Sequence, residues 1–171
     1  MVSVRTATPD DRSRIRECHV AAIRALGPEA YDERQVAAWA DKGDPVEDYP
    51  VEDDGHYIVV AERPHAAEPA TVDDSDAGVV GHGHLVPTEG EVRAVYVHPE
   101  ANGRGVGSAI LDALESRARD LRLDDLTLWA SLNAVGFYEQ AGYERAGRET
   151  YSTVHDGETV DLDVEKMAKR L

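Results

Sequence analysis

A strand, a glycine-rich turn and a helix follow one another directly in the middle of the chain. Alternating residues from Glu91 to His98 predict the strand, and Pro99 ends it. The turn holds the alternate glycines of Gly103–Gly107, and an apolar stripe over Val106–Leu121 predicts a long helix. Such glycines let an anion reach the unpaired backbone N–H groups of a helix start, so this turn favours a phosphate or pyrophosphate site.

The turn alone leaves a second interpretation open, because glycines also serve tight strand-to-helix turns that bind nothing. It is not a P-loop, since no Gly-Lys-Ser/Thr ending follows. A nucleotide-dependent oxidoreductase with a Rossmann unit fits poorly, because that fingerprint belongs near the first strand of a parallel series. Several hairpin-like strands precede the turn here.

The other segments predict one domain over residues 1–171. The expected strands cover 2–8, 57–62, 78–86 and 126–131, the expected helices cover 10–26, 31–40 and 133–140, and two final strands flank a turn at 155–158. The connection from Arg63 to Ala77, rich in Pro, Ala and Asp, is the segment expected to be mobile.

A second motif follows the next strand and strengthens the first. It reads Ser131-Leu132-Asn133-Ala134-Val135-Gly136-Phe137-Tyr138-Glu139-Gln140-Ala141-Gly142-Tyr143. The two motifs, in this order, resemble the GNAT-type superfamily of acetyl-CoA-dependent N-acetyltransferases over essentially the whole chain. The resemblance implies an α/β fold of the α+β type, with a mixed, mostly antiparallel central sheet that is flanked by helices and splays apart at the acetyl-CoA cleft.

The resemblance also implies how acetyl-CoA is held as cosubstrate, with no metal. Its pantetheine arm pairs like an added strand with the end of the strand before the turn, and its pyrophosphate sits on the turn. The implied cofactor-binding residues are Val95, Tyr96, Val97, Asn102, Gly103, Arg104, Gly105, Val106, Gly107, Ser108, Ser131, Asn133 and Tyr138. The family usually has Gln or Arg where Asn102 stands, which leaves the contact of that side chain open.

Two residues match catalytic positions of the family. Tyr138 matches the tyrosine that protonates, or donates a hydrogen bond to, the leaving thiolate of CoA, and a phenol with a pKa of about 10 keeps its proton at neutral pH. Glu91 stands where some relatives hold a glutamate that accepts the proton of the amine through water; a solvated carboxylate at a strand start is the alternative. Period-two alternation predicts that Glu91, Arg93, Val95 and Val97 share one strand face.

Two further groups are candidates for the acceptor side of the cleft. His82 and His84 share a strand face, where they either shuttle protons or are half-exposed strand residues, and two ligands are too few to favour a metal site. Tyr31, Gln35 and Trp39 recur at helical spacing. They resemble an acceptor-site helix of some bacterial and archaeal acetyltransferases, although a stripe of this kind is also typical of a core.

The charge balance limits the classes of molecule that the protein is expected to bind. The chain has 34 acidic and 18 basic residues, a net charge of −16, which argues against a broad basic face for nucleic acid. Its few lysines and Asp-rich loops resemble proteins of salt-loving archaea, in which salt screens the repulsion between carboxylates. The acidity therefore indicates habitat rather than substrate.

The lengths of the apolar runs and the cysteine content indicate the cellular compartment. No apolar run approaches the ~20 residues that cross a bilayer, which argues against a membrane protein. The single cysteine, Cys18, is expected to be buried in the first helix, and one cysteine forms no internal disulfide. These features favour a cytoplasmic protein.

The resemblance to the GNAT-type superfamily predicts an N-acetyltransferase that moves the acetyl group of acetyl-CoA to a primary amine by direct attack in a ternary complex. A small-molecule amine is favoured over a protein, because the loops are not extended for gripping one. A non-catalytic acyl-CoA-binding sensor of the same fold is the alternative. Because members of this family often dimerise, a homodimer is a further expectation.

Overall fold

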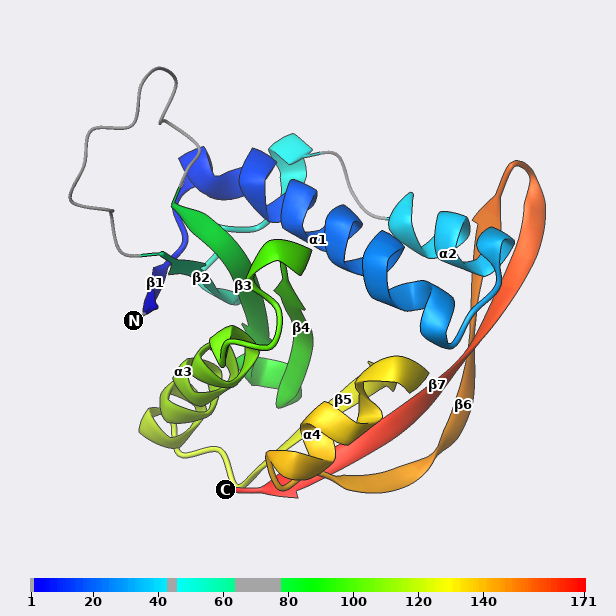
Figure 1. The fold of residues 1–171 in the computed structure, drawn as a ribbon. Coiled ribbons are helices and arrows are strands. Elements are labelled where there is room, and N and C mark those ends of the chain that lie inside the picture. Colours follow the sequence, from blue (N-terminus) through cyan, green and yellow to red (C-terminus); the bar gives the residue numbers. More distant parts are fainter. Residues whose placement is uncertain (1, 43–45, 64–77) are drawn as a thin grey trace.

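The computed structural model describes residues 2–42, 46–63 and 78–171. Seven strands form one sheet in the order β1-β2-β3-β4-β5-β7-β6, with helices on both of its faces (Figure 1). The strands are β1 (Ser3–Thr6), β2 (Tyr57–Glu62), β3 (Val79–Val86), β4 (Glu91–Val97), β5 (Asp125–Ser131), β6 (Glu144–His155) and β7 (Glu158–Arg170). The α-helices are α1 (Arg12–Leu26), α2 (Glu33–Ala40), α3 (Val106–Asp120) and α4 (Val135–Gln140). This is the mixed, mostly antiparallel architecture that the sequence predicts.

One contact divides the sheet into two arms. All neighbouring strands are antiparallel except β4 and β5, which are parallel and pair in register only at Glu91 and Thr127. We call β1–β4 the amino-terminal arm and β5, β7 and β6 the carboxy-terminal arm. Beyond this single pair the arms separate towards the carboxyl ends of β4 and β5, and the gap between them positions the site.

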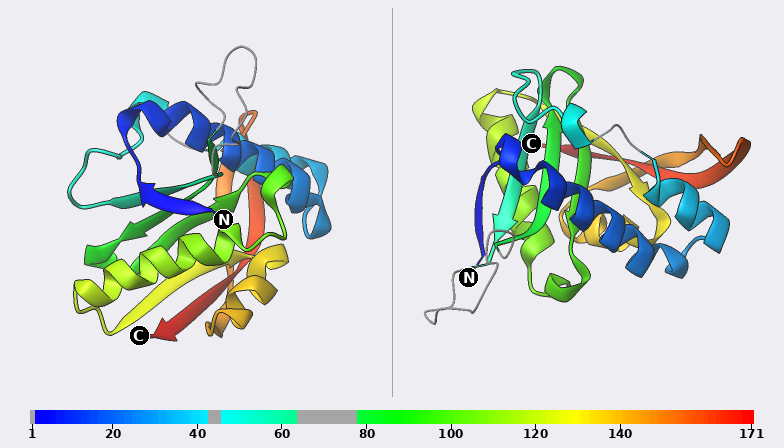
Figure 2. Two further views of the ribbon diagram at one scale, coloured as in Figure 1. Left: turned by 60° about the vertical axis from the view of Figure 1, so that its left-hand side comes forward. Right: turned by 90° about the horizontal axis from the view of Figure 1, so that it is seen from above.

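The amino-terminal arm is covered on both faces. Helix α1 packs on one face and α3 on the other, and every residue of β3 is buried (Figure 2). At Gly83 a Cβ would lie 2.4 Å from Cγ2 of Ile110, so only glycine lets α3 approach this closely. None of the described helices is long and apolar enough to cross a bilayer.

The carboxy-terminal arm is covered less completely. Helix α2 packs on Val160 and Leu162 of β7, and the tip of the β6–β7 hairpin lies beside it (Figures 1 and 2). Strand β6 is the edge of the sheet and pairs only with β7, so most of its residues are exposed. This arm therefore leaves side chains open to a ligand.

Several boundaries differ from the sequence prediction for local reasons. A 3-10 turn, Pro9–Asp11, precedes α1, where proline at the first position favours a tight turn. Helix α2 begins only at Glu33, because Asp32 caps it by accepting a hydrogen bond from the Gln35 N–H at 2.8 Å. Tyr31 thus precedes the helix in which it was expected.

Two further predictions concern Cys18 and the connection from Arg63 to Ala77. Cys18 is fully buried in α1, which confirms its prediction. The expected mobile connection falls almost wholly on residues 64–77, which lie outside the described part of the chain.

A bulge in β4 overturns one prediction about its faces. Pairing with β3 runs down to Ala94 and resumes at Val92, so Arg93 is an extra residue in the strand. The extra residue reverses the alternation: Val92 packs with Val95 in the core beside α3, and Glu91 lies on the opposite face. The predicted common face for Glu91 and Val95 is therefore wrong.

Candidate functional site

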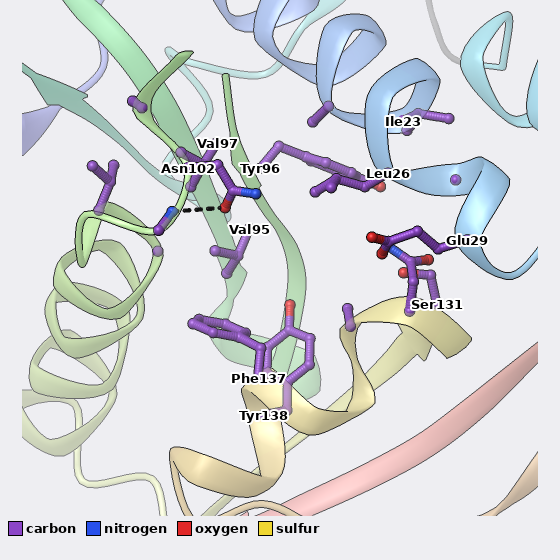
Figure 3. A pocket seen from close by; sticks show the side chains of 18 of the residues that line it. Ile23, Leu26, Glu29, Val95, Tyr96, Val97, Asn102, Ser131, Phe137 and Tyr138 are labelled. Carbon is purple, nitrogen blue, oxygen red and sulfur yellow. Dashed lines mark hydrogen bonds between the residues drawn. The ribbon is translucent and has the colours of Figure 1, made fainter. Parts of the chain in front are cut away.

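The separation of the two arms opens a cleft of about 510 Å3 between the ends of β4 and β5. Its walls come from the end of β4, the glycine turn, the start of α3, helix α4 and the end of α1 (Figure 3). Every cofactor-binding residue that the sequence resemblance implies lines this cleft, except Arg104. One turn and two strand ends, distant along the chain, thus form one cavity.

The edge of β4 that faces the gap is available for pairing. On the other edge, the His98 N–H donates to the Val80 carbonyl oxygen at 2.7 Å. Backbone groups point alternately to the two edges of a strand, so the N–H and C=O groups of Val95 and Val97 point into the gap. An extended ligand pairs with such an edge as an added strand.

The glycine turn forms a cradle for an anion. Gly103 and Gly105 have φ values of +71° and +78°, a conformation that favours glycine. The Ala109 N–H donates the first hydrogen bond of α3, to the Gly105 oxygen at 3.0 Å, so the N–H groups of residues 106–108 precede the helical pattern. These donors and the positive end of the helix dipole suit a pyrophosphate.

The Asn102 side chain folds back onto the turn. Its Oδ1 accepts a hydrogen bond from the Gly103 N–H at 3.0 Å (Figure 3). The side chain therefore stabilises the turn, and the backbone supplies the anion donors. Arg104 is exposed and lies outside the cleft lining.

Tyr138 and Asn133 bring polar groups to the opposite wall. The Tyr138 ring is buried, and its hydroxyl points into the cleft (Figure 3). Burial, reinforced by nearby Tyr96, raises the pKa of Tyr138, so the phenol keeps its proton. Oδ1 of Asn133 is buried without a hydrogen-bond partner in the described part of the chain, which leaves an acceptor for a ligand.

A second cavity, of about 350 Å3, lies on the α2 side of the carboxy-terminal arm. We call it the aromatic pocket; its lining residues are Tyr31, Trp39, Tyr96, Trp129, Ser131, Glu149, Thr150, Tyr151, Leu162 and Val164. Trp39, Tyr96 and Ser131 line the cleft as well, so the two cavities meet at these side chains.

Of the residues expected on the acceptor side, Tyr31 and Trp39 line the aromatic pocket, whereas Gln35 does not. The Gln35 side chain accepts from the Asp32 N–H at 3.0 Å and donates to the Asp161 oxygen at 2.8 Å. Gln35 thus caps α2 and ties it to β7.

His82 and His84 lie beneath α1 and line neither cavity, although the His82 ring stacks on Tyr96, which lines both, with the two ring centroids 5.5 Å apart. Their exposed fractions are 1% and 5%, so neither is half-exposed as one interpretation predicted. Nε2 of His84 lies 2.7 Å from Nδ1 of His56. Burial lowers the pKa of both His82 and His84 to about 3, aided by neighbouring imidazoles, so both rings are neutral at pH 7.

Glu91, the carboxylate proposed as general base, lines neither cavity and lies where the two arms join. Nε of Arg93 lies 3.5 Å from the Glu91 carboxylate. Burial raises the pKa of Glu91. Glu29 lines the cleft (Figure 3), and Glu149 lines the aromatic pocket. Sequence reasoning missed both, since each lies on a segment with no motif.

Comparisons with known proteins agree with this geometry. The model of the acetyltransferase (GNAT) domain family matches residues 58–155. The structure of a GCN5-related N-acetyltransferase from Rhodopseudomonas palustris is 30% identical and has a TM-score of 0.80, covering 99% of this chain and 95% of that one. No curated protein sequence matches the chain.

More distant structures share the fold. PaiA N-acetyltransferase from Thermoplasma acidophilum, solved with coenzyme A, is 16% identical with a TM-score of 0.64, covering 100% and 99% of the two chains. YncA from Salmonella typhimurium, solved with its cofactor acetyl-CoA, is 20% identical with a TM-score of 0.66, covering 99% and 94%. Because the family model matches more than half of the chain, and the fold agrees throughout, the chain belongs to the GNAT acetyltransferase family.

Proposed function

We propose that the protein is an acetyl-CoA-dependent N-acetyltransferase that acts on a primary amine of a small molecule. The observation that carries this proposal is the junction of the two cavities at Trp39, Tyr96 and Ser131. Direct transfer requires the nitrogen and the thioester carbon to be neighbours, and two cavities that share a wall hold them so.

The residues of the cleft fit acetyl-CoA. The open edge at Val95 and Val97 suits the amides of the pantetheine arm, and the N–H groups of residues 106–108 suit the pyrophosphate. The unpartnered Oδ1 of Asn133 accepts one further donor. When bound, acetyl-CoA supplies the thioester that the amine attacks.

Tyr138 acts as the general acid in this proposal. The amine forms a C–N bond, the C–S bond breaks, and the leaving sulfur takes the hydroxyl proton of Tyr138. The raised pKa of Tyr138 keeps that proton available at neutral pH. Glu91 stays the proposed acceptor of the amine proton; it lines neither cavity, so water must connect it to the amine.

The rival proposal is a sensor that binds acyl-CoA without turnover. Calorimetry of CoA binding and an assay for release of the CoA thiol distinguish it from the enzyme. Calorimetry with acetyl-CoA, CoA and NAD in parallel should show saturable binding of both CoA forms and none of NAD. Gly107→Val should weaken that binding at least tenfold, since a Cβ there already lies 3.2 Å from the Phe137 ring. CoA binding without release of the CoA thiol in the presence of any amine favours the sensor, and no CoA binding overturns both.

Tyr138→Phe tests the catalytic role. We expect kcat to fall by about 10²-fold or more while the Kd of CoA is unchanged, because only the proton donor is lost. Thiol release reports turnover with little background: Cys18 is buried, and burial raises its thiol pKa to about 11. An unchanged kcat would remove Tyr138 from the mechanism.

We also propose that the protein works in a salt-rich cytoplasm. With a net charge of −16, the carboxylates of the folded chain repel one another, and salt screens that repulsion. Thermal unfolding in rising KCl should show an increasing Tm. A Tm that does not change with salt would contradict this proposal.

A further inference from the structure

We infer that the aromatic pocket binds an arylalkylamine, a primary monoamine joined by a short chain to a flat aromatic ring. The inference rests on the proposed function and names its acceptor class. It follows from the composition of the pocket, the exposure of its rings and the charges beside them.

Aromatic side chains are concentrated in this pocket. Five of its ten lining residues are aromatic: Tyr31, Trp39, Tyr96, Trp129 and Tyr151. They are half of all the Phe, Trp and Tyr residues of the chain and include both tryptophans. Rings around a cavity of about 350 Å3 favour a flat apolar ligand, because they gain offset-stacked or edge-to-face contacts with its ring.

The carboxy-terminal arm holds two of these rings open to solvent. Trp129 is 42% exposed and Tyr151 is 38% exposed, whereas large aromatic residues usually bury most of their surface. The register pairs Tyr151 with Leu162 and Glu149 with Val164, which places these side chains on one face of the arm. A ligand ring seated there covers apolar surface that the chain itself leaves exposed.

The opposite wall of the pocket presents ring surface. The Tyr31 and Trp39 rings meet edge to face, with centroids 5.6 Å apart. The Tyr31 hydroxyl is already used: it donates to the Asp163 oxygen at 2.6 Å and accepts from the Leu132 N–H at 3.0 Å. Tyr31 therefore offers its ring rather than its hydroxyl to a ligand.

The junction with the cleft fixes where the nitrogen lies. The acetyl group comes from the cleft, so the amine must reach Ser131 and Tyr96, which line both cavities. The remainder of the acceptor then extends into the aromatic pocket. A short chain between nitrogen and ring meets this geometry.

The charges around the pocket disfavour di- and polyamines. Nζ of Lys42 lies 3.9 Å from the Tyr151 ring centroid, and Nζ of Lys166 lies 5.4 Å from the Trp129 centroid. The chain's own ammonium groups thus occupy cation sites on both rings and repel a second ligand ammonium. Glu149, the one carboxylate among the described lining residues, accepts a hydrogen bond from Nε1 of Trp129.

Tryptophan fluorescence tests the pocket without turnover, because both tryptophans of the chain line it. The CoA-saturated protein is titrated with 2-phenylethylamine and, separately, with 1,4-diaminobutane, neither of which absorbs at the red edge of tryptophan absorption. We expect a saturable change with 2-phenylethylamine and none with the diamine. No change with 2-phenylethylamine would overturn the inference.

Matched variants separate the pocket from the rest of the hairpin. Tyr151→Ala should raise the KM for 2-phenylethylamine about tenfold, because one ring of the pocket is lost, and leave the Kd of CoA unchanged. Val154→Thr, three residues further along β6, 71% exposed and outside the pocket, should change neither constant. Equal KM values for wild type and Tyr151→Ala would contradict the inference.

An acetyl-transfer panel keeps the two proposals distinct. Transfer to 2-phenylethylamine with a kcat/KM at least tenfold above that of 1,4-diaminobutane supports both. Preferred transfer to the diamine overturns the arylalkylamine inference and leaves the acetyltransferase intact. Saturable binding of 2-phenylethylamine in the fluorescence titration, without release of the CoA thiol in the presence of any amine, supports the pocket and overturns the catalytic proposal.

Discussion

Strands β3 and β6 show how differently the two arms of one sheet are built. Every residue of β3 is buried between α1 and α3, whereas most residues of β6 are exposed at the edge of the sheet. In the buried arm, small residues and neutral rings let two helices approach the sheet closely. In the open arm, aromatic side chains remain available to a ligand. The most deeply buried strand thus lies in the amino-terminal arm, and the most exposed strand, which contributes to the aromatic pocket, lies in the carboxy-terminal arm.

The comparison predicts that the buried arm responds most strongly to acid. The folded-state pKa of His82 and of His84 is lowered to about 3, from 6.5 when the rings are free. Below pH 6.5 the unfolded chain therefore binds more protons than the folded one, so stability is full above that pH and is lost as the pH falls towards 3. We expect the free energy of unfolding to fall by about 3 to 5 kcal/mol from neutral pH to about pH 4.5. Denaturant unfolding at fixed salt measures it.

A single substitution shows whether the buried imidazoles cause that loss. His82→Gln removes one titrating ring, so the pH slope of stability should decrease by up to about 1.4 kcal/mol per pH unit. If the variant and the wild type have the same slope below pH 6.5, other groups cause the acid response and the contrast between the arms is weaker than proposed.

The close approach of α3 to β3 predicts the next largest effect. In Gly83→Ala the added methyl group meets Ile110 Cγ2 at 2.4 Å and Leu114 Cδ1 at 3.0 Å, so we expect a loss of about 1 to 3 kcal/mol in the free energy of unfolding. The matched control is Gly136→Ala in α4, where a Cβ meets nothing within 4 Å. Alanine favours a helix, so that variant should gain about 0.5 to 1 kcal/mol. Equal losses in both variants would show that tight packing is not the cause.

Local patterns in the sequence predicted the scaffold well. Helical spacing of apolar residues marked α1 and α3, and alternation marked β1 and β4, because burial on one face of an element imposes those periods. The glycine turn and the segment around Tyr138 could be predicted because a backbone conformation and a family motif are each encoded within a few consecutive residues. The cleft that they form follows from the fold that the motifs imply.

Other features depend on contacts between distant segments. A bulge residue such as Arg93 leaves no mark in the alternation of residue types along the sequence. The bulge, and with it the face on which Glu91 lies, is visible only in the pairing register of β4 with β3. Trp129 and Tyr151 lie on different strands, and β7 between them brings them to one pocket. No pattern within one segment records such a neighbour.

Two features had local signals that went unused. Asp32 and Gln35 form an Asp-x-x-Gln capping box, which explains why Gln35 faces the start of α2 and not the pocket. Gly81 and Gly83 alternate with His82 and His84, and glycine in a strand often marks a close approach by another element. That alternation was consistent with burial on both faces, and hence with buried histidines.

The same substitution placed in each arm should change stability by different amounts. Val→Thr keeps the shape and the branching of the side chain and replaces one methyl group with a hydroxyl group, so its cost depends on whether that hydroxyl stays in water. Val92 is buried in the core beside α3, and Val92→Thr should lose about 1 to 3 kcal/mol of unfolding free energy. Val154 on β6 is mostly exposed, and Val154→Thr should change it by less than about 0.5 kcal/mol. Denaturant unfolding of both variants measures the difference. A loss at Val154 as large as the loss expected at Val92 would mean that the open arm is covered in solution, as pairing with a second copy of the chain would do.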